Sequence, residues 1–105
     1  MNHGLPETAV ERIRQTLAGH SDVEKAVLYG SRAKGCQRPG SDIDLTLIGE
    51  NLNHGSLTRI ANELDELMLP WQIDLSLHSS LTHPPLLDHI RRVGVVLYDK
   101  CSAAT

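Results

Sequence analysis

Residues Gly30 to Leu45 read G-S-R-A-K-G-C-Q-R-P-G-S-D-I-D-L, a Gly-Ser turn followed by two aspartates, Asp42 and Asp44. Side chains alternate across a β-strand, so residues two apart lie on the same face with their Cα atoms roughly 6–7 Å apart. The two carboxylates are therefore expected to share one face of a strand. Carboxylates this close repel each other unless protons or cations lie between them, and Mg²⁺ prefers oxygen ligands of this kind. The segment predicts a site for metal-bound phosphate.

The glycine and serine that begin the segment predict a phosphate-binding turn. Gly30 has no side chain, so a phosphate can approach its backbone closely. Ser31 adds a hydroxyl, and backbone N–H groups at a helix start favour anions. A Gly-Ser pair alone is more often an ordinary turn at the end of a strand. The aspartates that follow at a fixed distance favour the phosphate site instead.

The sequence around this segment predicts an α/β (α+β) fold, in which a small mixed sheet is covered by helices. The aspartates begin a strand whose apolar residues face away from them and need a helical cover. Leu64, Leu67 and Met68 keep the helical period and are expected to supply it, on a helix that Pro70 ends. The predicted helices cover residues 6–18, 56–68 and 84–93, and the predicted strands cover residues 25–29, 42–48, 71–77 and 95–98.

The composition predicts one small domain over residues 1–100, followed by a polar tail over residues 101–105. The chain has 105 residues, one Trp, two Tyr and no Phe, so aliphatic side chains must form the core. Its formal net charge of -3 argues against a broad basic surface for long nucleic acid. The two cysteines form no metal or disulfide framework, and the six histidines form no metal-binding motif. No apolar run is long enough to span a bilayer and the N-terminus has no signal pattern, so we expect a cytoplasmic protein.

The segment as a whole resembles the signature of the DNA polymerase beta-like nucleotidyltransferase superfamily, in which a Gly-Ser pair is followed after ten residues by Asp-any-Asp. Here the pair is Gly30-Ser31 and the dyad is Asp42 and Asp44. The full wording G-S-x-A-x-G-x-x-x-x-x-S-D-x-D-L and the short chain are most similar to the minimal nucleotidyltransferases. Members of that group are often encoded with a helical HEPN-domain partner. The resemblance implies a nucleotidyltransferase fold of the polymerase beta palm type.

The resemblance also implies which residues form the active site. Asp42 and Asp44 would bind two Mg²⁺ ions, and the family places a third carboxylate on a later strand, where Asp74 is the only acidic residue. Asp74 would complete the second metal site or accept the proton of the attacking hydroxyl, although an aspartate on an edge strand can also simply face water. The remaining candidates would contact the nucleoside triphosphate: Gly30, Ser31, Ser41, Arg32, Lys34 and Arg38. Each of the three basic residues among them is equally typical of a solvated surface charge.

The function implied by the resemblance is metal-dependent transfer of a nucleoside monophosphate, AMP from ATP, to a hydroxyl. The chain offers little room for an acceptor site, so we expect a partner to supply it. That partner would be a HEPN-type RNase toxin, modified on a tyrosine, and the chain would be its antitoxin. Two alternatives remain: a binding antitoxin that neutralises its partner by contact alone, and a small-molecule nucleotidyltransferase of the aminoglycoside type.

Overall fold

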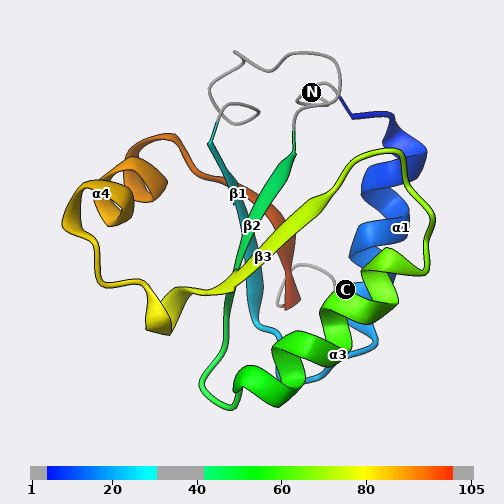
Figure 1. Cartoon of the computed structure of the whole chain (residues 1–105), viewed down its shortest axis with the longest axis horizontal. Helices are drawn as coiled ribbons and strands as arrows, with labels where there is room; N and C mark the ends of the chain where they lie inside the picture. Colours follow the sequence, from blue (N-terminus) through cyan, green and yellow to red (C-terminus); the bar gives the residue numbers. More distant parts are fainter. Residues whose placement is uncertain (1–4, 31–41, 101–105) are drawn as a thin grey trace.

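The computed structural model of the chain describes residues 5–30 and 42–100. The tail and five of the predicted site residues, namely Ser31, Arg32, Lys34, Arg38 and Ser41, lie outside the described residues. All seven predicted helices and strands are present, with ends shifted by a few residues, and a short 3₁₀ helix follows the third strand. The elements are α1 (Glu7–Ala18), β1 (Lys25–Tyr29), β2 (Ile43–Ile48), α3 (His54–Asp65), β3 (Ile73–Leu77), η1 (His78–Ser80), α4 (Pro84–Val93) and β4 (Val95–Asp99) (Figure 1).

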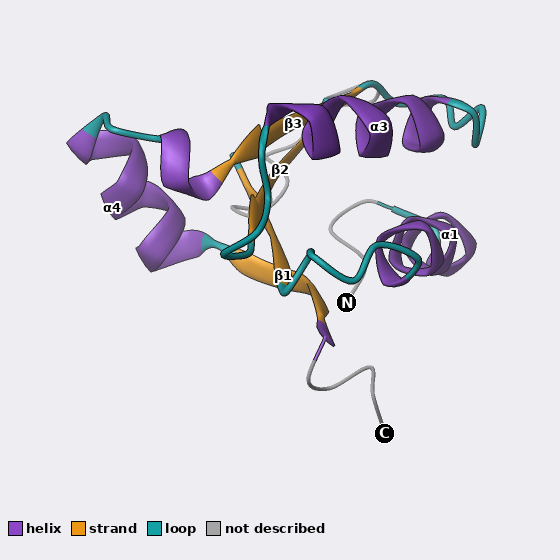
Figure 2. Ribbon diagram, turned by 90° about the horizontal axis from the view of Figure 1, so that it is seen from below, coloured by secondary structure: helices purple, strands orange, loops and turns teal. Residues whose placement is uncertain are grey.

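The strands form one mixed sheet in the order β3-β2-β1-β4. β1 is antiparallel to both of its neighbours, β2 and β4, whereas β2 and β3 are parallel. A parallel pair needs a crossover between its strands, and α3 provides it here. Figure 2 shows α1 and α3 on one face of the sheet and α4 on the other. The predicted mixed sheet with helical cover is therefore confirmed.

The apolar face of the sheet packs against α1 and α3. Ile43, Leu45 and Leu47 of β2 are buried on this face, as their alternation with the aspartates predicts. On β1, Ala26 lies opposite Leu47 and Leu28 lies opposite Leu45. Each fully buried aliphatic side chain of this kind contributes about 1.5–3 kcal/mol. The two helices add Val10, Ile13, Leu17, Ile60 and Leu64 to the same core.

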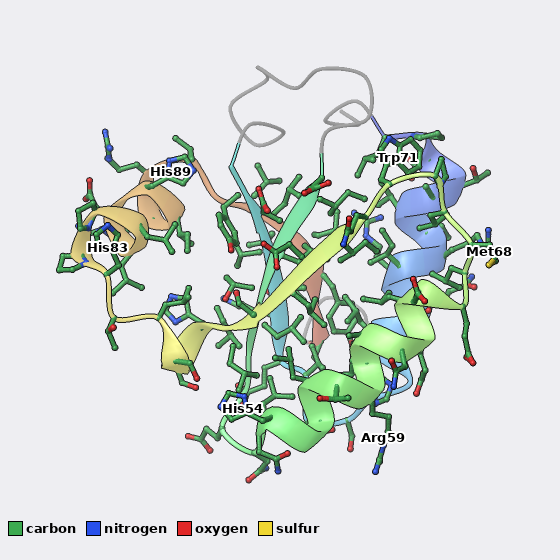
Figure 3. All side chains as sticks on the ribbon, viewed as in Figure 1. His54, Arg59, Met68, Trp71, His83 and His89 are labelled. Atoms are coloured by element: carbon green, nitrogen blue, oxygen red, sulfur yellow. The ribbon has the colours of Figure 1, made fainter. Side chains whose placement is uncertain are left out.

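The end of α3 differs from the prediction. The helix stops at Asp65, and Met68, expected to be buried, is 86% exposed with a φ of 57°. The N–H of Met68 donates to the Asp65 carbonyl in a tight turn, and the left-handed backbone directs its side chain away from the core (Figure 3). Leu64, inside the helix, and Leu67, beyond its end, do pack against the core as expected. The prediction is wrong for Met68 and for the residue at which the helix ends.

The other face of the sheet carries a row of polar side chains beneath α4. Asp44 and Thr46 of β2 point to this face, between their register partners on β1 and β3. α4 packs against β1 on this side of the sheet (Figure 2). Thr46, which the alternation placed on the polar face, is completely buried there. No helix in the described ranges is both long enough and apolar enough to cross a membrane.

The substitution Thr46→Val is expected to stabilise the protein. Within the described residues, the buried Thr46 hydroxyl has no hydrogen-bond partner, and an unsatisfied buried hydroxyl costs about 1–3 kcal/mol. Valine has nearly the same shape and suits a strand. We expect the free energy of unfolding to rise by about 1–2 kcal/mol, measured by urea denaturation. Thr58→Val is the control, because the exposed Thr58 hydroxyl already donates to the His54 carbonyl at 3.0 Å. An equal change in both variants would contradict the explanation.

Candidate active site

Two of the predicted carboxylates lie directly opposite each other. Asp44 of β2 is the register partner of Asp74 on the parallel strand β3, and of Tyr29 on the antiparallel strand β1. Asp42 is exposed and comes immediately before β2, where the Ile43 N–H donates to the Gln72 carbonyl at 2.8 Å. The structure thus brings Asp44 and Asp74 together, with Asp42 at the start of the same strand.

The electrostatics of Asp44 show how closely these groups interact. Burial raises the pKa of the Asp44 carboxyl above its usual range, and the charges of Asp74 and Asp42 raise it further. A carboxylate whose charge is disfavoured by burial and by two neighbouring carboxylates is suited in chemistry to a hard divalent cation. Among residues 5–30 and 42–100, however, no three His, Cys, Asp or Glu side chains converge as a metal-binding group. The fit to Mg²⁺ therefore rests on the donor chemistry of these aspartates.

Gly30 is required by a contact that sequence reasoning did not foresee. It ends β1 with a φ of 80°, in the left-handed region that glycine adopts without strain. A Cβ at this position would lie 2.3 Å from Asp44 Oδ2 and 3.3 Å from its Cγ. The absence of a side chain at Gly30 therefore leaves space for the Asp44 carboxylate, in addition to any space that it leaves for phosphate.

Tyr29 and His89 also belong to this site, and neither was among the predicted residues. The His89 Nε2 accepts a hydrogen bond from the Gly30 N–H at 3.0 Å, and the two rings meet edge to face with centroids 6.4 Å apart. Burial is the main cause of a raised Tyr29 pKa; a hydrogen bond with the Ser76 side chain lowers it, and Asp44 and Asp74 raise it. The position of Tyr29 directly before Gly30 was an available signal. No local signal in the sequence indicates His89, because it lies 59 residues from Gly30, to which it is hydrogen-bonded.

Comparison with known proteins gives the family. Residues 11–102 match the protein family described as Polymerase beta, Nucleotidyltransferase. The chain belongs to this family. This nucleotidyltransferase is also 37% identical, over 73 residues, to a Haemophilus influenzae protein named "Probable protein adenylyltransferase MntA". The match covers 69% of this chain and 63% of the relative, which is less than two thirds of its length.

Solved structures show the same fold for the nucleotidyltransferase. A chain in the crystal structure of a toxin-antitoxin with AMP-PNP matches with a TM-score of 0.70 and 22% identity, over 86% of this chain and 73% of that one. Another, in the structure of a tri-AMPylated Shewanella oneidensis HEPN toxin in complex with MNT antitoxin, matches with a TM-score of 0.67 and 17% identity, over 93% and 76%. These likenesses, together with the family match, confirm the fold and the family that the Gly30 to Leu45 motif predicted.

Proposed function

We propose that this nucleotidyltransferase transfers AMP from ATP to a tyrosine hydroxyl of a HEPN-domain toxin, and so acts as an antitoxin. The observation that carries the proposal is the opposed pair Asp44 and Asp74 beside the Gly30 turn, in a chain of this family. The similarity to an MntA named as a protein adenylyltransferase supports a protein as the acceptor. The toxin-antitoxin structures with the same fold are consistent with a HEPN partner, whose identity is part of the proposal.

The nucleotide side of the proposed site begins at the end of β1. Gly30 turns the chain here into the predicted phosphate-binding loop, and the lack of a side chain keeps the backbone close to Asp44. Residues of that loop would bind the triphosphate through hydroxyl, amide and cationic groups. The proposed triphosphate ligands are Gly30, Ser31, Arg32, Lys34, Arg38 and Ser41.

The carboxylate side of the proposed site performs the proton transfer. Asp42, Asp44 and Asp74 are the residues that would hold Mg²⁺, which neutralises phosphate charge when it is bound. The acceptor oxygen forms a bond to the α-phosphorus, the bond from that phosphorus to pyrophosphate breaks, and the hydroxyl proton passes to a carboxylate. Asp74 is best placed to accept it, because it is exposed directly opposite Asp44, whereas Asp44 is partly buried and Asp42 lies before the start of β2.

The position of Asp74 also favours an acceptor that comes from outside the chain. β3 is an edge strand of the sheet, and the Asp74 side chain is exposed on it. An attacking hydroxyl carried by another protein can therefore reach Asp74 from the open edge without crossing the sheet. A buried acceptor pocket within the chain is not needed.

The test is transfer of label from α-labelled ATP, with Mg²⁺, to the protein encoded beside this chain, which the proposal expects to be a HEPN-domain toxin. The double substitution Asp42→Ala and Asp44→Ala is expected to reduce labelling by about 10³-fold or more, because metal-assisted charge stabilisation contributes several kcal/mol to the barrier. Glu50→Gln is the matched control: this exposed carboxylate lies beyond the opposite end of β2 and should leave labelling unchanged.

Three outcomes would contradict the proposal. If the partner is never labelled while the double variant still neutralises its toxicity, the chain is a binding antitoxin. If label appears only on an added aminoglycoside, the chain is a small-molecule nucleotidyltransferase. If another nucleotide replaces ATP in the labelling, the fold and acceptor stand but the choice of AMP is wrong.

A further inference from the structure

A hydrogen bond connects α4 to the turn that ends β1. The Gly30 N–H donates to His89 Nε2 at 3.0 Å across 59 residues of sequence. A ring nitrogen that accepts a hydrogen bond carries no proton, so the proton of neutral His89 lies on Nδ1. This contact occupies the Gly30 N–H, so Gly30 would serve the triphosphate through the space that its missing side chain leaves and not as a hydrogen-bond donor.

The turn has two reasons to need such an anchor. Glycine has more backbone freedom than any other residue, and Gly30 is held at a φ of 80°. The Asp44 carboxylate lies against the space that a Cβ on Gly30 would fill. A change in the backbone conformation of Gly30 would therefore change the surroundings of that carboxylate. Without an acceptor, the partly buried Gly30 N–H would be unsatisfied, which favours a different backbone conformation.

The acceptor is presented by a helix that is itself held firmly against the sheet. Ile90, next to His89, is 6% exposed, and the N–H of Gly94 closes the end of α4 on the Ile90 carbonyl at 2.8 Å. The edge-to-face contact with Tyr29 sets the direction of the imidazole ring. On the outer side of α4, Asp88 pairs with Arg91 and Arg92, each at 2.9 Å. Figure 3 shows His89 on the side of α4 nearest the upper part of the sheet.

We propose that His89 is a positioning residue of the nucleotide site. It holds Gly30 in the left-handed conformation that leaves space for the Asp44 carboxylate, and it touches no substrate itself. The inference rests on the proposed function, since it concerns the affinity of that same site for a nucleoside triphosphate. It adds a fourth element, α4, to a site otherwise built from β1, β2 and β3.

The test compares two substitutions that separate hydrogen bonding from ring packing. His89→Gln places an amide oxygen near the position of Nε2 and keeps an acceptor for the Gly30 N–H. His89→Phe keeps a ring against Tyr29 but has no acceptor. Loss of one hydrogen bond is expected to weaken binding of a non-hydrolysable ATP analogue with Mg²⁺ by about five- to tenfold in His89→Phe, and by no more than about twofold in His89→Gln. Affinity is measured by titration calorimetry on the full chain.

A second measurement reports on the contact without nucleotide. Amide hydrogen exchange of Gly30, followed by NMR, should become faster in His89→Phe and stay close to the unchanged protein in His89→Gln. If His89→Phe does not fold, His89→Leu is the second variant without an acceptor at this position, with the same expected results.

The possible results separate the inference from the proposed function. If the unchanged protein binds the analogue and His89→Phe binds it equally well, the positioning role is wrong while the proposed function stands. Equal losses in His89→Phe and His89→Gln would also overturn it, because the ring and not the hydrogen bond would then matter. Failure of the unchanged protein to bind any nucleoside triphosphate removes the proposed function and this inference with it.

Discussion

Replacing Asp44 by asparagine is expected to abolish nucleotidyl transfer and, at the same time, to stabilise the folded protein. Asparagine keeps the size of the side chain but removes the charge that would hold Mg²⁺, so transfer should fall by about 10³-fold or more. The stability gain follows from the raised pKa of Asp44, which reflects burial and the charges of Asp74 and Asp42. A carboxyl with a higher pKa in the folded than in the unfolded chain binds its proton more tightly when folded. Its ionisation therefore destabilises the fold at neutral pH, and this penalty disappears as pH falls through the raised value.

Thermal denaturation between pH 4 and pH 8, without divalent cations, measures this effect. We expect the unchanged protein to gain stability from Asp44 as pH falls toward the raised pKa, and Asp44→Asn to have a higher Tm at pH 7 without that part of the pH dependence. Added Mg²⁺ should raise the Tm of the unchanged protein more than that of Asp44→Asn. Glu50→Gln serves as the control for loss of a carboxylate. A lower Tm for Asp44→Asn at pH 7, or transfer at the original rate, would contradict the prediction.

Local patterns in the sequence were sufficient for the fold and for the strand faces on which Asp44 and Asp74 lie. Alternation along 42–48 and 71–77 predicts that each aspartate lies on the polar face of its strand, because a strand has only two faces, and the structure pairs the two strands. The helical period of α1 and α4 is equally local, and both helices are found where it predicts them. Patterns of this kind depend only on residues a few positions apart.

The features that the sequence did not predict depend on contacts between distant residues or on a change of backbone conformation. Met68 fits the helical period of α3, but the backbone leaves the helix at Asp65 and no residue before Pro70 marks that change. The contact between Gly30 and His89 requires α4 to pack on the polar face of the sheet, which no pattern within either segment specifies. The close packing of Gly30 on Asp44 likewise appears only once β1 and β2 are paired.

The polar face shows a cost to stability that the apolar face does not. Asp44 is held in a position that disfavours its charge, and Thr46 is buried without a partner among the described residues. Two such features at neighbouring positions on one face of a strand are unusual for a core that serves folding alone, since buried polar groups are normally satisfied. Their concentration around the Asp44 and Asp74 pair is expected where a face is arranged to bind a charged ligand.

The substitution Gly30→Ala is expected to cause a large loss of both stability and activity. An alanine at a φ of 80° is strained by about 1–2 kcal/mol, and its Cβ would stand 2.3 Å from Asp44 Oδ2. Relief of that overlap must move the carboxylate or the turn, at a further cost of about 1–3 kcal/mol. The free energy of unfolding should therefore fall by about 2–5 kcal/mol, which lowers the Tm by about 10–25 °C in a domain of this size. Displacement of Asp44 should also reduce transfer by about 10²-fold.

A double-mutant cycle separates the two causes. Asp44→Ala removes the oxygen and the Cγ that the new Cβ would overlap, and it leaves only the Asp44 Cβ, at an ordinary distance of 3.6 Å. Gly30→Ala should therefore cost less in the Asp44→Ala background, by about 1–3 kcal/mol, because only the backbone strain remains there. Gly19→Ala is the matched control: its φ is -74° and its Cβ would lie 3.4 Å from the Thr16 carbonyl oxygen, so little change in stability is expected. Additive effects of the two substitutions would mean that Gly30 is needed for its backbone conformation alone and not for the space it leaves to Asp44.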